Sequence, residues 1–156
     1  GVIEISYSDQ ESFFPRPKHK YDAEALVVIE DKIVLFSKDR EGLVSDLYLI
    51  DKLLDGSQIL TSEVSYDVNT LITGGDYNEE NSLLALVGYN SQGYQHLILF
   101  NEFKINNLDN NNFIKYKIPL EQAQIEAIKI IDKKTFWVTS EDEGIGSPIM
   151  YKIEVE

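Results

Sequence analysis

Three apolar triplets recur along the chain at a spacing of 51 residues. Leu47-Tyr48-Leu49 is followed by Ile98-Leu99-Phe100 and then by Ile149-Met150-Tyr151. A second series at the same spacing consists of Leu35-Phe36-Ser37, Leu86-Val87-Gly88 and Trp137-Val138-Thr139. A fixed period of this length is typical of proteins that stack copies of one supersecondary unit. The repeat therefore predicts three equivalent units rather than one irregular fold.

Each unit contains short apolar runs that are separated by polar turns, which is the pattern of β-strands. No segment shows the sustained periodicity of a helix, so we expect an all-β fold. Val2 to Tyr7 adds one further strand ahead of the first unit. The predicted strands of the three units are a first series at about 24–29, 71–76 and 125–131, a second at 32–38, 83–89 and 134–140, a third at 46–51, 96–102 and 148–155, and a more polar fourth at 58–66 and 113–118.

The second run of each unit is apolar at successive positions, as in Leu83 to Val87. A strand in a sheet with one solvent-exposed face would alternate apolar and polar residues instead. Both faces of these sheets must therefore be covered. Four-stranded units that cover each other's faces describe the blades of a β-propeller. We predict one domain, 1–156, with three four-stranded antiparallel blades at about 22–66, 71–118 and 124–156. A β-sandwich or barrel is the alternative.

Three blades cannot close a ring, because propellers close with about four to eight. The sequence therefore predicts half of a six-bladed propeller, completed either by further N-terminal sequence or by a second copy in a homodimer. In the first case, residues 2–7 are the outer strand of a preceding blade. The two end blades would each expose an apolar face, so we expect the isolated chain to self-associate.

The charge balance limits the partners of the chain. Twenty-seven acidic and 14 basic residues give a formal net charge of −13, which repels phosphate backbones and anionic lipid surfaces. The apolar runs are far shorter than the ~20 residues that span a bilayer. We therefore expect neither nucleic acid nor membrane insertion. The chain has no cysteine, which removes thiol chemistry.

Candidate site residues follow from blade geometry. In antiparallel sheets the start of the first strand lies beside the end of the second, so both segments of every blade meet at one rim. The rim candidates for ligand binding are Asp22, Glu24, Lys38, Asp76, Tyr89, Glu126 and Glu141, within a wider set that includes Asp39, Arg40, Thr73, Gln124, Ser140, Asp142 and Glu143.

Two interpretations of the acidic rim residues stay open. In the first, Glu24, Glu126 and Glu141 converge to bind Ca²⁺, which takes six to eight oxygen ligands. In the second, Glu24 and Glu126 hold the blades together by accepting backbone hydrogen bonds or by pairing with Lys38. Nucleophilic catalysis and zinc binding are disfavoured, because His19 and His96 are the only histidines and neither belongs to the predicted rim.

Several segments resemble the second half of a bacterial propeller family. They include Tyr7-Ser8-Asp9-Gln10 with Phe14-Pro15, Tyr21 to Leu26, Leu35 to Arg40, Ile72 to Asn78, Leu86 to Tyr89, Gln124 to Ile128 and Thr139 to Glu141. The family consists of uncharacterised secreted or lipoprotein-like proteins that are common in Bacteroidetes and similar in style to phytase-like and SdiA-regulated propellers. The resemblance covers most of the chain.

What the resemblance implies is a location rather than an activity. It implies an extracytoplasmic protein, either periplasmic, secreted or a lipoprotein, with an N-terminal half that precedes this segment. Phytase-like propellers bind calcium through clustered carboxylates, but their ligand motifs do not match residue by residue here. Propellers carry enzymes, lectins and scaffolds on one architecture.

We therefore expect a non-enzymatic propeller that binds a small ligand, a glycan or a protein at the rim. The alternative is a calcium-dependent hydrolase of phosphate or carboxylic esters that uses the acidic rim.

Overall fold

The computed structural model describes residues 1–15, 17–120, 123–141 and 147–156. In these ranges the regular structure is strand, apart from one short 3₁₀ turn, η1 (Leu108–Asn110), and none of it is α-helix or could cross a bilayer as a helix. The predicted all-β fold is therefore confirmed. The strands are β1 (Ile3–Tyr7), β2 (Ala23–Ile29), β3 (Lys32–Ser37), β4 (Ser45–Asp51), β5 (Gly56–Leu60), β6 (Val64–Tyr66), β7 (Leu71–Asn78), β8 (Leu83–Tyr89), β9 (Gln95–Phe100), β10 (Phe113–Lys117), β11 (Gln124–Ile130), β12 (Thr135–Glu141) and β13 (Met150–Glu154).

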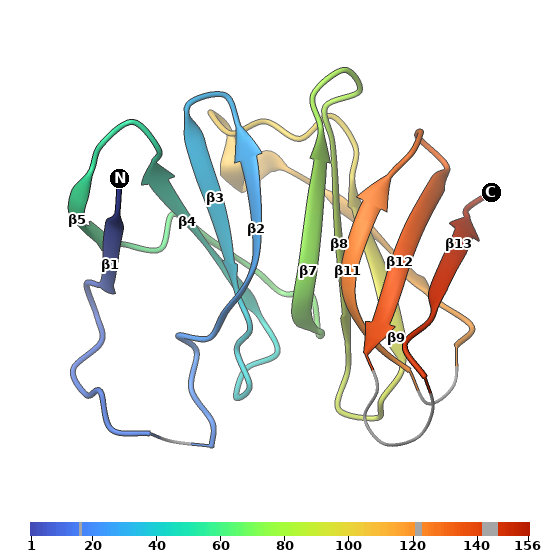
Figure 1. The fold of residues 1–156 in the computed structure, drawn as a ribbon, viewed down its shortest axis with the longest axis horizontal. Coiled ribbons are helices and arrows are strands. Elements are labelled where there is room, and N and C mark those ends of the chain that lie inside the picture. The colour runs from blue at the N-terminus through green and yellow to red at the C-terminus, as the bar shows by residue number, and fades with distance from the viewer. Residues whose placement is uncertain (16, 121–122, 142–146) are drawn as a thin grey trace.

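The strands form three antiparallel sheets that follow one another along the chain (Figure 1). Sheet 1 has the order β2-β3-β4-β6, sheet 2 the order β7-β8-β9-β10, and sheet 3 the order β11-β12-β13. None of these sheets closes on itself, and β1 and β5 form a separate parallel pair. Two of the three predicted units are thus four-stranded, whereas sheet 3 has three strands in the part of the chain that the structure describes.

The single strand predicted at 58–66 is wrong, because this segment forms two strands with different partners. β6 pairs with β4, but β5 leaves sheet 1 and pairs with β1. The Gln58 side chain fixes the start of β5 against the end of β4. Its Oε1 accepts the Asp51 N–H at 3.0 Å, and its Nε2 donates to the Asp51 carbonyl oxygen at 2.8 Å.

The first strands of the three sheets lie side by side. β7 contacts β2 of sheet 1 on one side and β11 of sheet 3 on the other (Figure 1). Sheet 2 is therefore covered on both faces. Leu84 and Leu86 belong to the core shared with sheet 1, and Ala85 and Val87 belong to the core shared with sheet 3. This two-sided burial explains why β8 is apolar at successive positions.

The spacing of the repeat is less regular than the triplets predict. Leu47 pairs with Phe36, Leu97 with Val87, and Met150 with Thr139, each next to a bulge in the first strand. Leu97 and Met150 are therefore the equivalents of Leu47. The true spacings are 50 residues from Leu47 to Leu97 and 53 from Leu97 to Met150, so the predicted equivalents Ile98 and Ile149 are each displaced by one residue. A displacement of one residue moves a side chain to the opposite face of the sheet.

Each first strand carries one β-bulge at the same place. The pairing with the second strand shifts between Ala23 and Ala25, between Ile72 and Gly74, and between Ile125 and Ala127. The extra residues are Glu24, Thr73 and Glu126. A bulge leaves its extra residue out of the ladder and redirects its side chain. The recurrence of Glu24 and Glu126 in the sequence thus marks a recurring backbone irregularity.

The β1–β5 pair covers part of the outer face of sheet 1. The Tyr7 ring meets the Tyr48 ring edge-on, with centroids 4.9 Å apart. Leu26 and Val28 of β2 face the same side but remain 59% and 52% exposed. The small core under β1 and β5 consists of Ile3, Tyr7, Ile33, Leu35, Tyr48, Ile50 and Leu60.

Gly74 of sheet 2 lies close to the backbone of sheet 3. A Cβ on Gly74 would lie 2.6 Å from the carbonyl oxygen of Glu126, which is backbone and cannot move aside. A Cβ on the neighbouring Gly75 would meet the flexible tip of the Leu86 side chain at 2.8 Å. We expect Gly74→Ala to lower the free energy of unfolding by about 1–3 kcal/mol through overpacking. Urea denaturation should show a clearly smaller loss for Gly75→Ala, and equal losses would contradict this account of the interface.

Candidate functional site

Charged and polar side chains from all three sheets meet at the bulged ends of the first strands. We call this group the charged cluster. The bulges direct Glu24 and Glu126 to it, and the second strands end beside it. In the middle sheet, the Thr73 hydroxyl at the equivalent bulge bonds the Ile125 carbonyl oxygen and so ties sheet 2 to sheet 3. The charged cluster consists of Asp22, Glu24, Lys38, Arg40, Tyr89, Gln124, Glu126 and Glu141.

Lys38 lies at the centre of the charged cluster and is only 2% exposed. Its backbone N–H donates to the Asp22 carbonyl oxygen at 2.7 Å, which fixes the side chain where β3 ends. The Nζ lies 3.4 Å from Oε1 of Glu24 and 5.3 Å from the centre of the Tyr89 ring. It also attracts the Glu126 carboxylate. A buried ammonium needs such partners, because burial of an unpaired charge costs several kcal/mol.

Arg40 forms the second cationic centre. Its Nε donates to Oδ2 of Asp22 at 3.0 Å, and its Nη2 lies 2.9 Å from the same oxygen. The same Nη2 lies 3.8 Å from Oε1 of Glu24. Arg40 also interacts with Tyr89, so it links sheet 1 to sheet 2. Asp22 and Glu24 are therefore neutralised within the protein.

Glu126 is a partly buried carboxylate of the charged cluster. Burial raises the pKa of Glu126 above its ordinary value, and the negative charges of Glu141 and Glu24 raise it further. Gln124 donates hydrogen bonds to both Glu126 and Glu141, the second at 3.0 Å, and this bonding together with the charge of Lys38 opposes the rise. Gln124 thus holds two carboxylates close together.

The structure gathers six of the seven rim candidates and separates one. Asp22, Glu24, Lys38, Tyr89, Glu126 and Glu141 belong to the charged cluster. Asp76 lies further along β7, where its carboxylate accepts the Ile130 N–H at 2.7 Å and pairs with Lys129 Nζ at 2.9 Å. Asp76 therefore joins β7 to β11 and does not reach the charged cluster, because it lies three residues beyond the bulge at Thr73.

The wider candidate set has mixed roles. Arg40 and Gln124 belong to the charged cluster, and Thr73 bridges two sheets. The Asp39 Oδ1 accepts the N–H groups of Glu41 and Gly42 at 2.8 and 3.0 Å, so it closes the turn that follows β3. Ser140 bonds the backbone of Ile149. Asp142 and Glu143 lie outside the described residues.

The described residues contain no group of three or more His, Asp or Glu side chains that could hold a metal ion. Glu24, Glu126 and Glu141, which are the metal candidates of the sequence, share the cluster without forming such a group. Glu24 faces two cations of the protein, and Gln124 stands between Glu126 and Glu141. One oxygen of each of the three carboxylates, Oε1, already has a protein partner.

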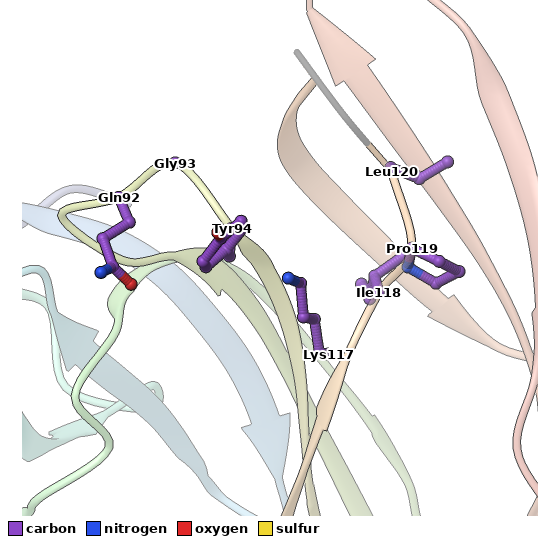
Figure 2. A pocket seen from close by; sticks show the side chains of 7 residues that line it. All are labelled: Gln92, Gly93, Tyr94, Lys117, Ile118, Pro119 and Leu120. Atoms are coloured by element: carbon purple, nitrogen blue, oxygen red, sulfur yellow. The ribbon is translucent and has the colours of Figure 1, made fainter.

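Sequence reasoning missed a shallow pocket beside sheet 2. Figure 2 shows Tyr94 and Lys117 facing each other across it, and the Lys117 Nζ lies 3.3 Å from the centre of the Tyr94 ring. The pocket has a volume of about 360 Å³ and is completed by Gln92, Gly93 and residues 118–120. An aromatic residue directly after a polar Gly-containing turn is the signal that would have found it.

Sequence reasoning also missed a buried histidine. His96 of β9 is 8% exposed, and its Nδ1 has no hydrogen-bond partner among the described residues. Burial lowers its pKa to about 4, with smaller contributions from Lys115 and Lys117. His96 therefore stays neutral at physiological pH and packs as a polar member of sheet 2.

Comparisons with known proteins return no match: no family model, no curated protein and no solved structure is significantly similar to the chain. The resemblance to secreted bacterial propellers therefore stays a prediction from the sequence.

The burial of Lys38 leads to a first test of the charged cluster. Lys38→Met keeps the length of the side chain but leaves Glu24 and Glu126 without their shared cation. We expect the free energy of unfolding to fall by roughly 3 kcal/mol, the lower end of the range for breaking a buried ion pair, because both carboxylates keep some contact with water. Urea denaturation at neutral pH measures the loss.

Lys152→Met is the matched control, because Lys152 pairs with Glu154 at the surface and the two side chains are 50% and 65% exposed. Exposed pairs contribute under about 1 kcal/mol. If the two variants lost the same stability, Lys38 would not be the electrostatic centre of the charged cluster.

His96 should make stability depend on pH in acid. Its pKa is about 4 in the folded protein and about 6.5 in unfolded chains, so the unfolded state gains its proton first as the pH falls. This contribution to stability is complete above pH ~6.5 and is lost as the pH falls towards ~4, up to about 3 kcal/mol.

In His96→Leu this part of the pH dependence should vanish. The loss of stability that protonation of carboxylates causes in acid should remain. The difference between the two unfolding curves across this window isolates His96. Titration of the His96 ring by NMR near its ordinary pKa would show that the side chain is not buried in the folded protein.

Proposed function

We propose that the three sheets are adjoining blades of a β-propeller and that the chain is a binding module without catalytic activity. Three features support the propeller. The first strands lie side by side, the middle sheet is buried on both faces, and each first strand carries a bulge at the same place. Following the resemblance, we place the protein outside the cytoplasm.

The composition of the charged cluster favours binding over catalysis. A hydrolase needs a nucleophile beside a base, or two carboxylates with different, unblocked roles. Here Asp22 and Glu24 are paired with Arg40 and Lys38. Such pairs fix side chains in place and present a rigid polar surface, which suits recognition.

The surplus of negative charge indicates the chemistry of the ligand. The cluster contains four carboxylates and two cations. Among the described residues neither Glu126 nor Glu141 forms an ion pair, although the charge of Lys38 acts on Glu126. The observation that carries the proposal is geometric: Gln124 holds the Glu126 and Glu141 carboxylates close together, whereas Lys38 and Arg40 pair with Glu24 and Asp22. The pKa of Glu126 is raised, mainly by burial and further by the charges of Glu141 and Glu24. We infer that the ligand presents an ammonium or guanidinium group at this position, as a basic peptide does.

A lysine-containing peptide tests this function directly. Isothermal titration should detect binding of the peptide and little binding of the same peptide with its lysine acetylated. Glu126→Gln should weaken binding about tenfold or more, since a hydrogen bond to a charged group contributes about 1.5–3 kcal/mol. Affinity should rise with pH through the raised pKa of Glu126, because only the ionised carboxylate attracts the cation.

Glu80→Gln is the control, since Glu80 is exposed in the turn at the other end of β7 and should leave affinity unchanged. Equal binding of the acetylated peptide, or equal effects of the two variants, would show that the charged cluster does not recognise cations.

A further inference from the structure

We propose that the shallow pocket between Tyr94 and Lys117 binds an organic carboxylate that has an apolar or aromatic body. The pocket shares no residue with the charged cluster, so the inference does not rest on the function proposed above. Three features carry it: the firm construction of the two walls, the free hydrogen-bond donors on the side chains that line them, and the positive charge of β10.

The first wall is a turn that its own side chains hold in place. The Oδ1 atom of Asn90 accepts the N–H groups of Gln92 and Tyr94, both at 3.0 Å. The Gly93 N–H donates to the Asn90 carbonyl oxygen at 2.9 Å, and Gly93 adopts a positive φ of 79°, which glycine accepts without strain. A wall fixed in this way keeps its shape without a ligand, which lowers the entropic cost of binding.

The buried residue Gln95 joins this turn to the second wall, which is the segment 117–120. Gln95 is 2% exposed. Its Nε2 donates to the Gly93 carbonyl oxygen at 3.1 Å, and its own carbonyl oxygen accepts the Ile118 N–H at 2.9 Å. Its Oε1 accepts the Ile125 N–H of β11 at 3.0 Å. One buried residue therefore anchors both walls to each other and to sheet 3.

The side chains of the pocket offer free donors and no carboxylate. The Lys117 Nζ, which faces the Tyr94 ring in Figure 2, forms no ion pair with any described residue. The Gln92 amide nitrogen and the Tyr94 hydroxyl also have no partner in the described part of the chain. No lining residue is acidic, although acidic residues outnumber basic ones by 27 to 14 in the whole chain. Such a set of donors, one of them charged, is complementary to an anionic oxygen group.

The strand that carries Lys117 has a second cation without a carboxylate bonded to it. The Lys115 Nζ donates to the two backbone carbonyl oxygens of residues 68–69 at 2.7 and 3.0 Å, although the charge of Asp67 acts on it. Both lysines also act on His96, which pairs with Lys117 across β9 and β10, and they add to the effect of burial that lowers its pKa. The pocket therefore adjoins a local positive charge in a protein that is acidic overall.

The rest of the lining is apolar and defines the body of the ligand. Pro119 is exposed, Leu120 is half-buried, and Ile118 lies buried between them and Lys117 in the sequence. The Tyr94 ring is 45% exposed. These surfaces suit an aromatic or aliphatic group whose carboxylate reaches the ammonium. The volume of about 360 Å³ is near the lower end of the range for small-molecule sites.

Phenylacetate and its neutral analogue phenylacetamide test the proposal, followed by NMR of the backbone amides. We expect saturable shift changes at Tyr94 and Lys117 with phenylacetate and about fivefold weaker binding of phenylacetamide, the effect of one exposed ion pair. Added salt should weaken the binding of phenylacetate only. Equal binding of the two compounds, shift changes confined to other parts of the chain, or no saturable change would overturn the proposal.

Lys117→Met removes the charge but keeps an unbranched side chain, so it should weaken the binding of phenylacetate about fivefold. Lys104→Met is the matched control, because Lys104 is also exposed and has no ion pair within the described ranges but lies outside this pocket. Equal affinities of the two variants would show that the pocket does not recognise the carboxylate through Lys117.

A carboxylate beside an apolar group occurs both in free acids and at the C-terminus of a peptide that ends in phenylalanine. The pocket is assigned to peptide C-termini if an acetylated peptide of this kind binds more tightly than phenylacetate and loses that affinity on amidation. It is assigned to free acids otherwise. Lys117→Met should leave binding of the lysine peptide at the charged cluster unchanged, so failure of this proposal and failure of the proposed function are distinguishable.

Discussion

The structure depends on sheet 2, which has no solvent-exposed face. Sheet 2 carries apolar side chains on both sides of β8, and neither side is stable in water. Sheet 1 and sheet 3 each cover one of these faces, so the middle of the chain determines where its two ends pack. The order of the sheets in space follows their order in sequence because each sheet is made of consecutive hairpins and has only its neighbours to bury against.

The same stacking creates the candidate site. Three first strands brought side by side place three bulges at one end, and a bulge redirects its extra residue away from the ladder. In sheets 1 and 3 this residue is a glutamate, and Lys38 lies between the two carboxylates. In sheet 2 it is Thr73, which joins backbone to backbone instead. One backbone irregularity thus supplies both two carboxylates of the cluster and a tie between the sheets.

Much of this could be predicted from the sequence, because strand-forming runs and polar turns are local signals. The gathering of Glu24, Lys38 and Glu126 followed from antiparallel geometry within each sheet together with the predicted stacking of the repeated units. The face of each residue was harder to predict: a constant spacing of 51 pairs Leu47 with Ile98, whereas the bulges and unequal turns make Leu97 its equivalent. Asp76 was wrongly grouped with the rim residues. It lies three residues after the bulge of β7 and so contacts β11 instead, and no sequence pattern shows where the bulge lies. The break at residues 61–63 was missed because β5 pairs with β1, a partner far away in the sequence.

The parallel pairing of β1 with β5 also bears on how the chain folds and opens. Each antiparallel sheet joins strands that are neighbours in sequence, so its hairpins close short loops early and at low entropic cost. β1 is instead separated from β5 in the sequence by β2, β3 and β4, and Glu4 bonds Ser57 and Ser8 bonds Thr61 across that separation. We therefore expect this segment to dock last and to detach first, in a local opening that leaves the three sheets intact. On this account the N-terminal strand has its own docking equilibrium, weaker than the packing of the three sheets.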